Sequence, residues 1–118
     1  MKPALLLLAA APAFACPLPP PALQGDGVQL AWRADPAIGR EAFAMAVRVC
    51  PADARLLRVD ATMPEHRHGM NYRPRLVPQA DGWRVEGLLF HMAGRWELRF
   101  DVEQGGRVQS LRQNVELK

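Results

Sequence analysis

Histidine and methionine side chains are concentrated in one ten-residue segment, Met63 to Tyr72, which holds two of the three histidines and two of the five methionines. His66, His68 and Met70 stand at positions i, i+2 and i+4. In an extended segment, this spacing directs all three side chains to one face. Imidazole nitrogen and thioether sulfur are donors that copper, and Cu(I) above all, selects from a protein. The spacing therefore predicts a copper site on this segment.

A second pair of such donors, His91-Met92, follows further along the chain. Loops that leave the same end of a domain can converge on one ion, because a rigid scaffold holds both of them. We therefore predict one site for Cu(I), Cu(II) or both. Its expected ligands are His66, His68, Met70, His91 and Met92.

Met63 is a weaker candidate for the same site. It has the opposite parity to His66, so its side chain would leave an extended strand on the other face. It also precedes Pro64, which favours a role in loop packing. Gly69 and Gly94 border the two segments. We expect them to serve backbone geometry, through a positive φ or a close approach of the two loops.

Zinc is the competing metal, because histidine binds it well, but thioethers are poor zinc ligands. Glu65 is the one carboxylate in the segment, and it offers only weak support for zinc. Glu65 could also be read as the base of a small metallohydrolase. However, the chain has no G-x-S-x-G motif, Cys/His pair, paired carboxylates or Gly-rich phosphate loop. We therefore predict a binding protein and not an enzyme.

The start of the chain has the pattern of a secretory signal peptide over residues 1–15. A lysine precedes an apolar run, Leu5 to Ala11, that is too short to span a bilayer, and an A-x-A site ends at Ala15. We expect cleavage after Ala15 and a periplasmic or secreted product without a transmembrane segment. Cys16 would then come first, which also allows lipoprotein processing. A lipobox prefers Leu three residues before the Cys, where this chain has Ala, so lipidation is the lesser alternative.

The two cysteines, Cys16 and Cys50, predict one disulfide in an exported domain. The bond would close a loop of about 35 residues, which the chain-entropy account values at roughly 4 kcal/mol. It would tie a Pro-rich leader, residues 16–27, to the end of a strand. Two other readings are open: a lipid anchor at Cys16 with a free Cys50, or Cys50 as a metal ligand.

Length and charge indicate one domain, residues 28–118, with a modest core. One of the 15 basic residues lies in the signal segment, and the remainder face 12 acidic residues, so the charge excess is small. The arginines are spread along the chain without a block. This distribution argues against a nucleic-acid partner.

Short alternating segments recur along the mature chain and are separated by turn residues. Outside the signal segment, no window has the 3.6-residue period of an amphipathic helix. The pattern predicts an all-β, immunoglobulin-like antiparallel β-sandwich of about seven strands. The alternating apolar sets are Val28, Leu30 and Trp32; Phe43, Met45, Val47 and Val49; Leu57, Val59 and Ala61; Trp83, Val85, Gly87 and Leu89; and Trp96, Leu98, Phe100 and Val102.

This arrangement gives the candidate ligands their places. Met63 to Tyr72 becomes a long connection after the third strand, and Arg73 to Val77 a short edge strand. His91 to Gly94 joins the Trp83 and Trp96 strands. Gly105-Gly106 predicts a hairpin turn into a last strand.

Two motifs together resemble the YtkA-like domain, a family of small exported β-sandwich proteins related in pattern to the FixH proteins. They are M-P-x-x-x-H-G-M at Met63 to Met70 and F-x-M-x-G-x-W at Phe90 to Trp96, and the likeness covers about residues 43–103. Family members are often associated with copper handling and cytochrome oxidase maturation. The resemblance therefore implies a metal role, with a membrane or cytochrome partner for copper delivery. The second family motif often has Pro where this chain has Ala93.

An alternative hypothesis needs no metal. Methionine side chains are flexible and suit adaptable contact surfaces. The same two loops could thus form a periplasmic interaction module that assists a membrane or cytochrome partner. Composition does not separate this hypothesis from copper binding, whereas a metal titration does.

Overall fold

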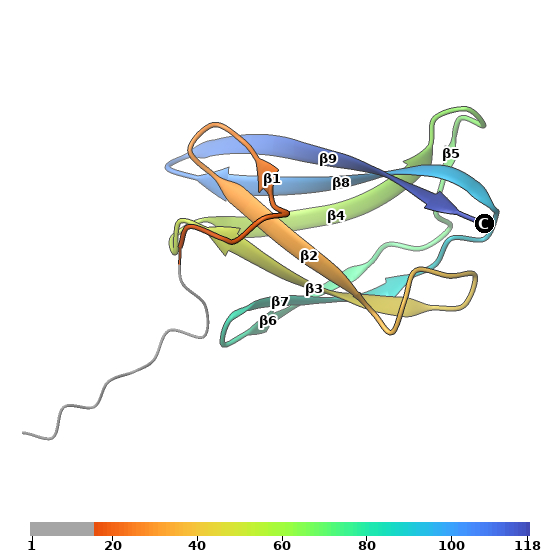
Figure 1. The fold of residues 1–118 in the computed structure, drawn as a ribbon, viewed down its shortest axis with the longest axis horizontal. Helices are drawn as coiled ribbons and strands as arrows, with labels where there is room; N and C mark the ends of the chain where they lie inside the picture. The colour runs from red at the N-terminus through yellow and green to blue at the C-terminus, as the bar shows by residue number, and fades with distance from the viewer. Residues whose placement is uncertain (1–15) are drawn as a thin grey trace, which may run out of the picture.

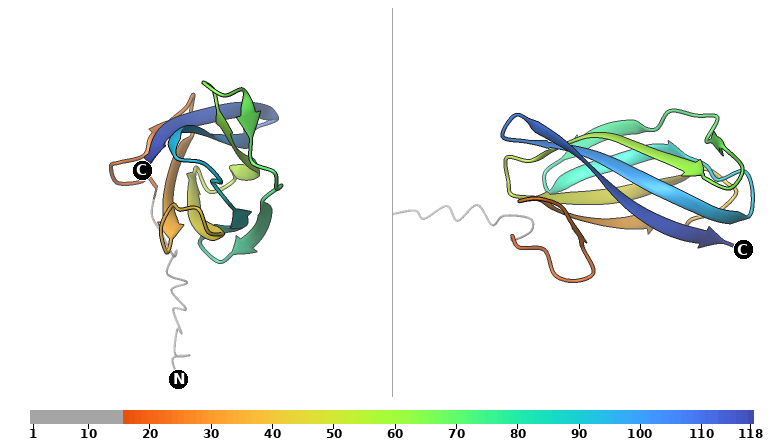
Figure 2. Two further views of the ribbon diagram at one scale, coloured as in Figure 1. Left: turned by 90° about the vertical axis from the view of Figure 1, so that its right-hand side faces the viewer. Right: turned by 90° about the horizontal axis from the view of Figure 1, so that it is seen from above.

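The computed structural model describes residues 16–118, which form two antiparallel β-sheets packed face to face (Figures 1 and 2). The predicted all-β sandwich is confirmed, while the predicted signal peptide lies outside the described residues. The strands are β1 (Leu23–Gln24), β2 (Gln29–Asp35), β3 (Phe43–Cys50), β4 (Arg55–Met63), β5 (His68–Gly69), β6 (Arg75–Gln79), β7 (Gly82–Leu88), β8 (Gly94–Gln104) and β9 (Arg107–Leu117).

One sheet has the order β1-β2-β3-β7-β6, and the other has the order β5-β4-β8-β9. The nine strands in the described part of the chain are two more than the expected seven. The two additional strands are β1 and β5, which contain only two residues each and are too short to show an alternating pattern. The expected edge strand is β6, which begins at Arg75 instead of Arg73. Within residues 16–118 there is no helix long and apolar enough to cross a membrane.

The core fills the space between the sheets. Strand β8 shows the predicted alternation most clearly, because its alternate residues from Trp96 to Val102 are all buried. Met45 on β3 is fully buried, as its place in an apolar alternating set predicts. The hairpin expected at Gly105-Gly106 joins β8 to β9, and both glycines have positive φ.

Two alternating sets were assigned wrongly, each because of a register shift. Leu57 was expected to face inward, but it is 41% exposed and its neighbour Leu56 is buried. The pairing of β4 with β8 shifts between Leu56 and Arg58, and an extra residue in a strand reverses which side chains face the core.

The second shift lies in β7, where its pairing with β3 is irregular opposite Phe43 to Met45. Val85 and Leu88 are the buried residues of this stretch, whereas Gly87 and Leu89 had been expected to share the face of Val85. Gly87 has a φ of 83°, a backbone conformation that glycine adopts readily at bulges.

The predicted disulfide joins Cys16 to Cys50, the last residue of β3. Cys50 is therefore not free to bind a metal. The leader packs on the domain: Leu18 is buried, its backbone N–H donates to Gln29 Oε1 (3.0 Å), and β1 pairs with β2. Since β4 runs away from this region, the residues that follow β4 lie at the other end of the sandwich (Figure 1).

Candidate metal centre

The two histidine-containing segments meet at one end of the sandwich. The first is the β4–β5 turn with β5, and the second is the loop between β7 and β8. The ring centres of His68 and His91 are 5.1 Å apart, and those of His66 and His68 are 5.8 Å apart. All three histidines of the protein thus form one cluster, which we call the histidine cluster.

A tight turn brings the first segment back along β4. The carbonyl of Met63 accepts a hydrogen bond from the backbone N–H of His66 (3.1 Å), and Pro64 follows Met63, where a fixed φ favours such a turn. Arg67 completes the reversal with a φ of 55°, the one positive value at a non-glycine residue in the described part of the chain. His68 then pairs directly with Met63 across the hairpin.

The turn corrects one expectation from the sequence. His66, His68 and Met70 were expected on one extended strand, but only His68 and Gly69 have strand geometry. His66 lies in the turn and is exposed. It still reaches the histidine cluster because its ring stacks on that of His68, with an interplanar angle of 28°.

Trp96 forms the floor of the cluster. It is fully buried, its ring lies parallel to Phe90 with centres 4.6 Å apart, and its Nε1–H donates to the carbonyl of Met92 (2.9 Å). The rings of His68 and His91 stand edge-on to it at 6.2 and 5.5 Å. Trp96 therefore holds the second loop through a hydrogen bond and supports two imidazoles through its ring.

His68 carries a buried atom without a partner. Its Nδ1 has no solvent access and no hydrogen bond in the structure. A buried polar atom left unsatisfied costs roughly 1–3 kcal/mol, so such atoms are rare without a reason. An electron-pair acceptor bound at this nitrogen would remove that cost.

The spacing of the imidazoles is compatible with a shared ion. Two imidazoles that bind one tetrahedral ion at about 2.0 Å have ring centres roughly 5 Å apart. The observed separations of 5.1 and 5.8 Å are close to this value. In residues 16–118, however, the His, Cys, Asp and Glu side chains form no ready group of three ligands. A metal would need rotated imidazoles and further donors.

Three methionines on the same two segments as the histidines are candidates for those further donors. Met63 is 1% exposed, lies opposite His68, and almost touches Gly94, where an added Cβ would come within 2.9 Å of the Met63 methyl carbon. Met92 is half-buried against the core. Its odd spacing from His66 predicts that Met63 faces away from the ligands. However, the chain reverses at the turn after Met63, so Met63 and His68 lie opposite each other in the hairpin.

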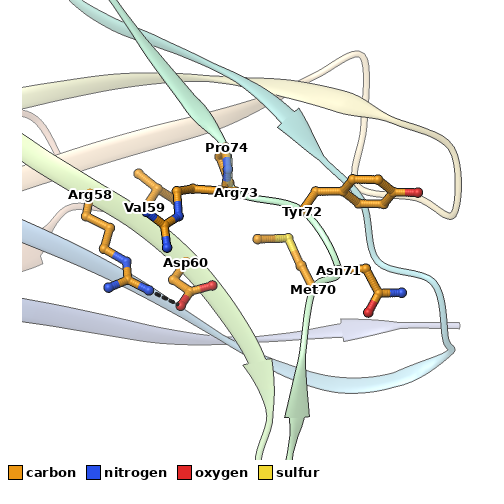
Figure 3. A pocket seen from close by; sticks show the side chains of 8 residues that line it. All are labelled: Arg58, Val59, Asp60, Met70, Asn71, Tyr72, Arg73 and Pro74. Atoms are coloured by element: carbon orange, nitrogen blue, oxygen red, sulfur yellow. Dashed lines mark hydrogen bonds and ion pairs between the residues drawn. The ribbon is translucent and has the colours of Figure 1, made fainter.

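Met70 is half-buried just beyond β5, where its backbone N–H donates to the carbonyl of Ala61 (3.3 Å). This bond continues the hairpin pairing by one residue. Its side chain lines a surface pocket beside β4 (Figure 3). Met70 thus lies next to the hairpin that carries His68 and also lines a separate surface pocket, for which the sequence motifs give no signal.

Glu65 is held in an ion pair with Arg95, 3.2 Å away, and both side chains are substantially exposed. The pair links the β4–β5 turn to the start of β8, so it helps to keep the two histidine segments together. A carboxylate engaged in this way is poorly placed to act as a general base. The positive φ of Gly94 and its approach to Met63 match the backbone role expected for that glycine.

The donor types fit a soft metal ion: three clustered imidazoles, one of them with an unsatisfied buried nitrogen, and thioethers on the same two chain segments. The place of Trp96 in the second motif agrees with its position beside the cluster, but its hydrogen bond to the Met92 carbonyl has no signal in the sequence. Comparison of the chain with protein-family models, curated proteins and solved structures finds no match.

Proposed function

We propose that this chain is an exported copper-binding protein that holds or passes on copper through the histidine cluster and neighbouring thioethers. The observation that carries the proposal is the convergence of His68 and His91 from two distant segments, with the Nδ1 of His68 buried and unpaired. A metal ion bound at this nitrogen would give the buried, unpaired atom a partner.

Copper is favoured over zinc by the donors that remain once the paired groups are set aside. Glu65 is held by Arg95, and both cysteines form the disulfide. Imidazoles and thioethers are left, and thioethers select Cu(I) whereas imidazoles accept both copper states. The ligands we propose are His66, His68 and His91 with one or more of Met63, Met70 and Met92.

The chain's own residues would have defined tasks. His68 presents a nitrogen from the protein interior, while the exposed His66 and His91 can rotate to meet an ion from solvent. Trp96 and Phe90 exclude water from the inner side of the cluster. A copper ion bound there would supply soft Lewis acidity or one-electron chemistry, and this site is suited to holding and releasing the ion.

We further propose membership of the YtkA-like family and a periplasmic or secreted location, with a membrane or cytochrome partner that receives the copper. The disulfide supports an oxidising compartment, because such bonds persist mainly outside the reducing cytosol. The M-P-x-x-x-H-G-M and F-x-M-x-G-x-W motifs support the family, since they supply the two segments that meet at the histidine cluster.

Competition with a chromophoric Cu(I) chelator tests the proposal. The protein without residues 1–15 should withdraw copper from a micromolar-affinity chelator at a ratio of one ion per chain. The double variant H66A/H68A should lose this ability, at least by the roughly tenfold to hundredfold that loss of an outer-shell partner costs. Asn114→Ala, on the exposed face of β9, is the matched control.

Failure of the wild-type protein to take copper, or equal competition by the double variant, would overturn the copper assignment. The interaction-module hypothesis would then be the better one. It has some support from the exposure of His66, His91 and Tyr72 at the same end of the molecule.

A further inference from the structure

A surface pocket lies beside the histidine cluster, where the chain crosses from one sheet to the other. Strand β4 forms one wall, and the segment from Met70 to Pro74, which leads to β6, forms the other (Figure 3). Its volume is about 260 Å³. This is below the roughly 300–1,000 Å³ of pockets that enclose drug-sized ligands, so it suits a small molecule or a single side chain.

Hydrogen-bond donors and positive charge dominate the lining. Arg58 and Arg73 come from the two opposite walls, and Asn71 and Tyr72 also line the pocket, with the Tyr72 ring pointing away from the arginines. Asp60 is the one acidic residue among the lining residues. Two guanidinium groups and one carboxylate leave the pocket with a net positive charge.

The carboxylate of Asp60 is already engaged. Its Oδ2 accepts from Arg58 (3.0 Å) and its Oδ1 accepts from the backbone N–H of Ala61 (2.8 Å). Arg73 forms no ion pair or side-chain hydrogen bond with any residue of the described chain. The pocket therefore offers one guanidinium fork without a partner and a second whose donors are only partly used.

The pocket is mostly polar. Its small apolar part comes from Met70 and Pro74, because Val59 is buried and offers little surface. A ligand with one charged end and only a short aliphatic body would match this lining. A planar guanidinium prefers carboxylate and phosphate groups, which it can bind through two parallel hydrogen bonds.

We propose that this pocket binds a carboxylate carried on a short aliphatic chain, held by Arg73 and Arg58 and resting on Met70. The carboxylate can belong to a small organic acid or to an acidic side chain of a partner protein. Met70 is also one of the proposed copper ligands, but Arg58 and Arg73, which would hold the carboxylate, are not, so the two sites can be tested separately.

Methyl NMR of the metal-free mature protein tests the proposal, with a chelator present so that metal binding cannot contribute. Two probes separate the sources: succinate, and a capped Gly-Glu-Gly peptide whose one charge is a side-chain carboxylate. Either probe should shift the Met70 methyl signal saturably, with a Kd on the order of 1 mM or tighter. The Met45 methyl, fully buried in the core, should not move.

Arg73→Gln should weaken the binding by roughly tenfold to a hundredfold, as expected for loss of a charge-assisted hydrogen bond. Arg33→Gln is the matched control, since Arg33 is exposed on β2, outside the pocket. Circular dichroism should show the same fold for both variants.

Succinate binding identifies a small acid as a sufficient ligand, and binding of the peptide alone identifies a partner's side chain. Both results support the site. The proposal is overturned if neither probe shifts Met70 saturably, or if Arg33→Gln weakens binding as much as Arg73→Gln does.

Discussion

Gly94 lies against the end of the Met63 side chain. A Cβ on Gly94 would lie 2.9 Å from the methyl carbon of Met63, and Gly94 has a φ of 126°, which side chains rarely allow. Met63 in turn is paired with His68. The glycine that opens β8 therefore leaves room for the end of the Met63 side chain, on the residue that pairs with His68.

The first prediction concerns Gly94→Ala. The added methyl group should displace the Met63 side chain and weaken Cu(I) binding roughly tenfold, as outer-shell changes at metal sites do. Chelator competition measures the effect. Gly106→Ala is the matched control, because Gly106 also has a positive φ (78°) but open space around it. Equal copper affinity in the two variants would contradict a role of Met63 in the site.

The second prediction concerns His68→Leu in the metal-free protein. Replacement of the imidazole by an apolar side chain removes the unsatisfied Nδ1, so the free energy of unfolding should rise by about 1 kcal/mol. Copper binding should fall sharply in the same variant. Urea denaturation measures the first effect and chelator competition the second.

His91→Leu serves as the control, since His91 is exposed and its replacement should not stabilise the fold. A metal-free His68→Leu protein that is clearly less stable than wild type would mean that the imidazole contributes packing which outweighs its unpaired nitrogen.

The third prediction concerns the methionines. Met70→Leu and Met92→Leu remove a soft donor at similar volume, so each should weaken Cu(I) more than Cu(II) if its sulfur binds the ion. Met45→Leu makes the same change in the core and should leave both affinities unchanged, at a stability cost below about 1.5 kcal/mol. Affinities for both oxidation states, measured in parallel, identify which thioether takes part.

The fourth prediction concerns the disulfide. Cys16→Ser combined with Cys50→Ser should lower the free energy of unfolding by roughly 2–4 kcal/mol, because the unfolded chain regains the entropy of an open loop. Copper affinity of the folded protein should stay the same, since the histidine cluster lies at the other end of the sandwich. A matching loss of copper affinity in folded protein would show that the two ends are coupled.

The fifth prediction concerns acid pH. The hydrogen bond from Arg75, opposed by desolvation and aided by the charges of Arg75 and Arg84, lowers the pKa of Glu86 below its ordinary value of 4.5. A lowered folded-state pKa means that the stabilisation is present above pH 4.5 and is lost as the pH falls through the folded-state value. Glu86→Gln should thus reduce stability at pH 7 and have little effect near pH 3.

Denaturation at the two pH values measures this difference, with Glu116→Gln on the exposed face of β9 as the control. The effect should be small, because the ion pairs of Glu86 with Arg75 and Arg84 lie at the surface, where solvent screens them. A pH-independent effect of Glu86→Gln would argue against the ion pairs.

Much of the fold could be predicted from residue alternation, because in a half-buried strand the apolar residues face the core and the polar residues face solvent. Strand β8 is the clear case, with Trp96 to Val102 buried at every second position. Prediction failed where two apolar residues adjoin, as at Leu56-Leu57 and Leu88-Leu89, since either could face the core. At these two places a bulge determines which leucine faces the core, and a bulge depends on pairing between strands that are distant in the sequence.

The candidate site could be predicted in its residue types but not in its geometry. The motif identified the histidines and methionines correctly as neighbours in sequence. That His91 would approach His68 follows from the order β5-β4-β8, which no local pattern encodes. The ion pair of Glu65 with Arg95 and the bond from Trp96 to the Met92 carbonyl depend on the same long-range pairing.

The pairing of Leu117 with Gly94 has a practical consequence for handling the protein. It places the last residues of β9 at the end of the sandwich that carries the histidine cluster, so an affinity tag fused after Lys118 would lie close to this cluster. A polyhistidine tag there would compete for the same ions. A tag or surface linker placed before Cys16 would instead sit at the far end of β4, whose nine residues span about 30 Å, and would leave the imidazoles facing solution.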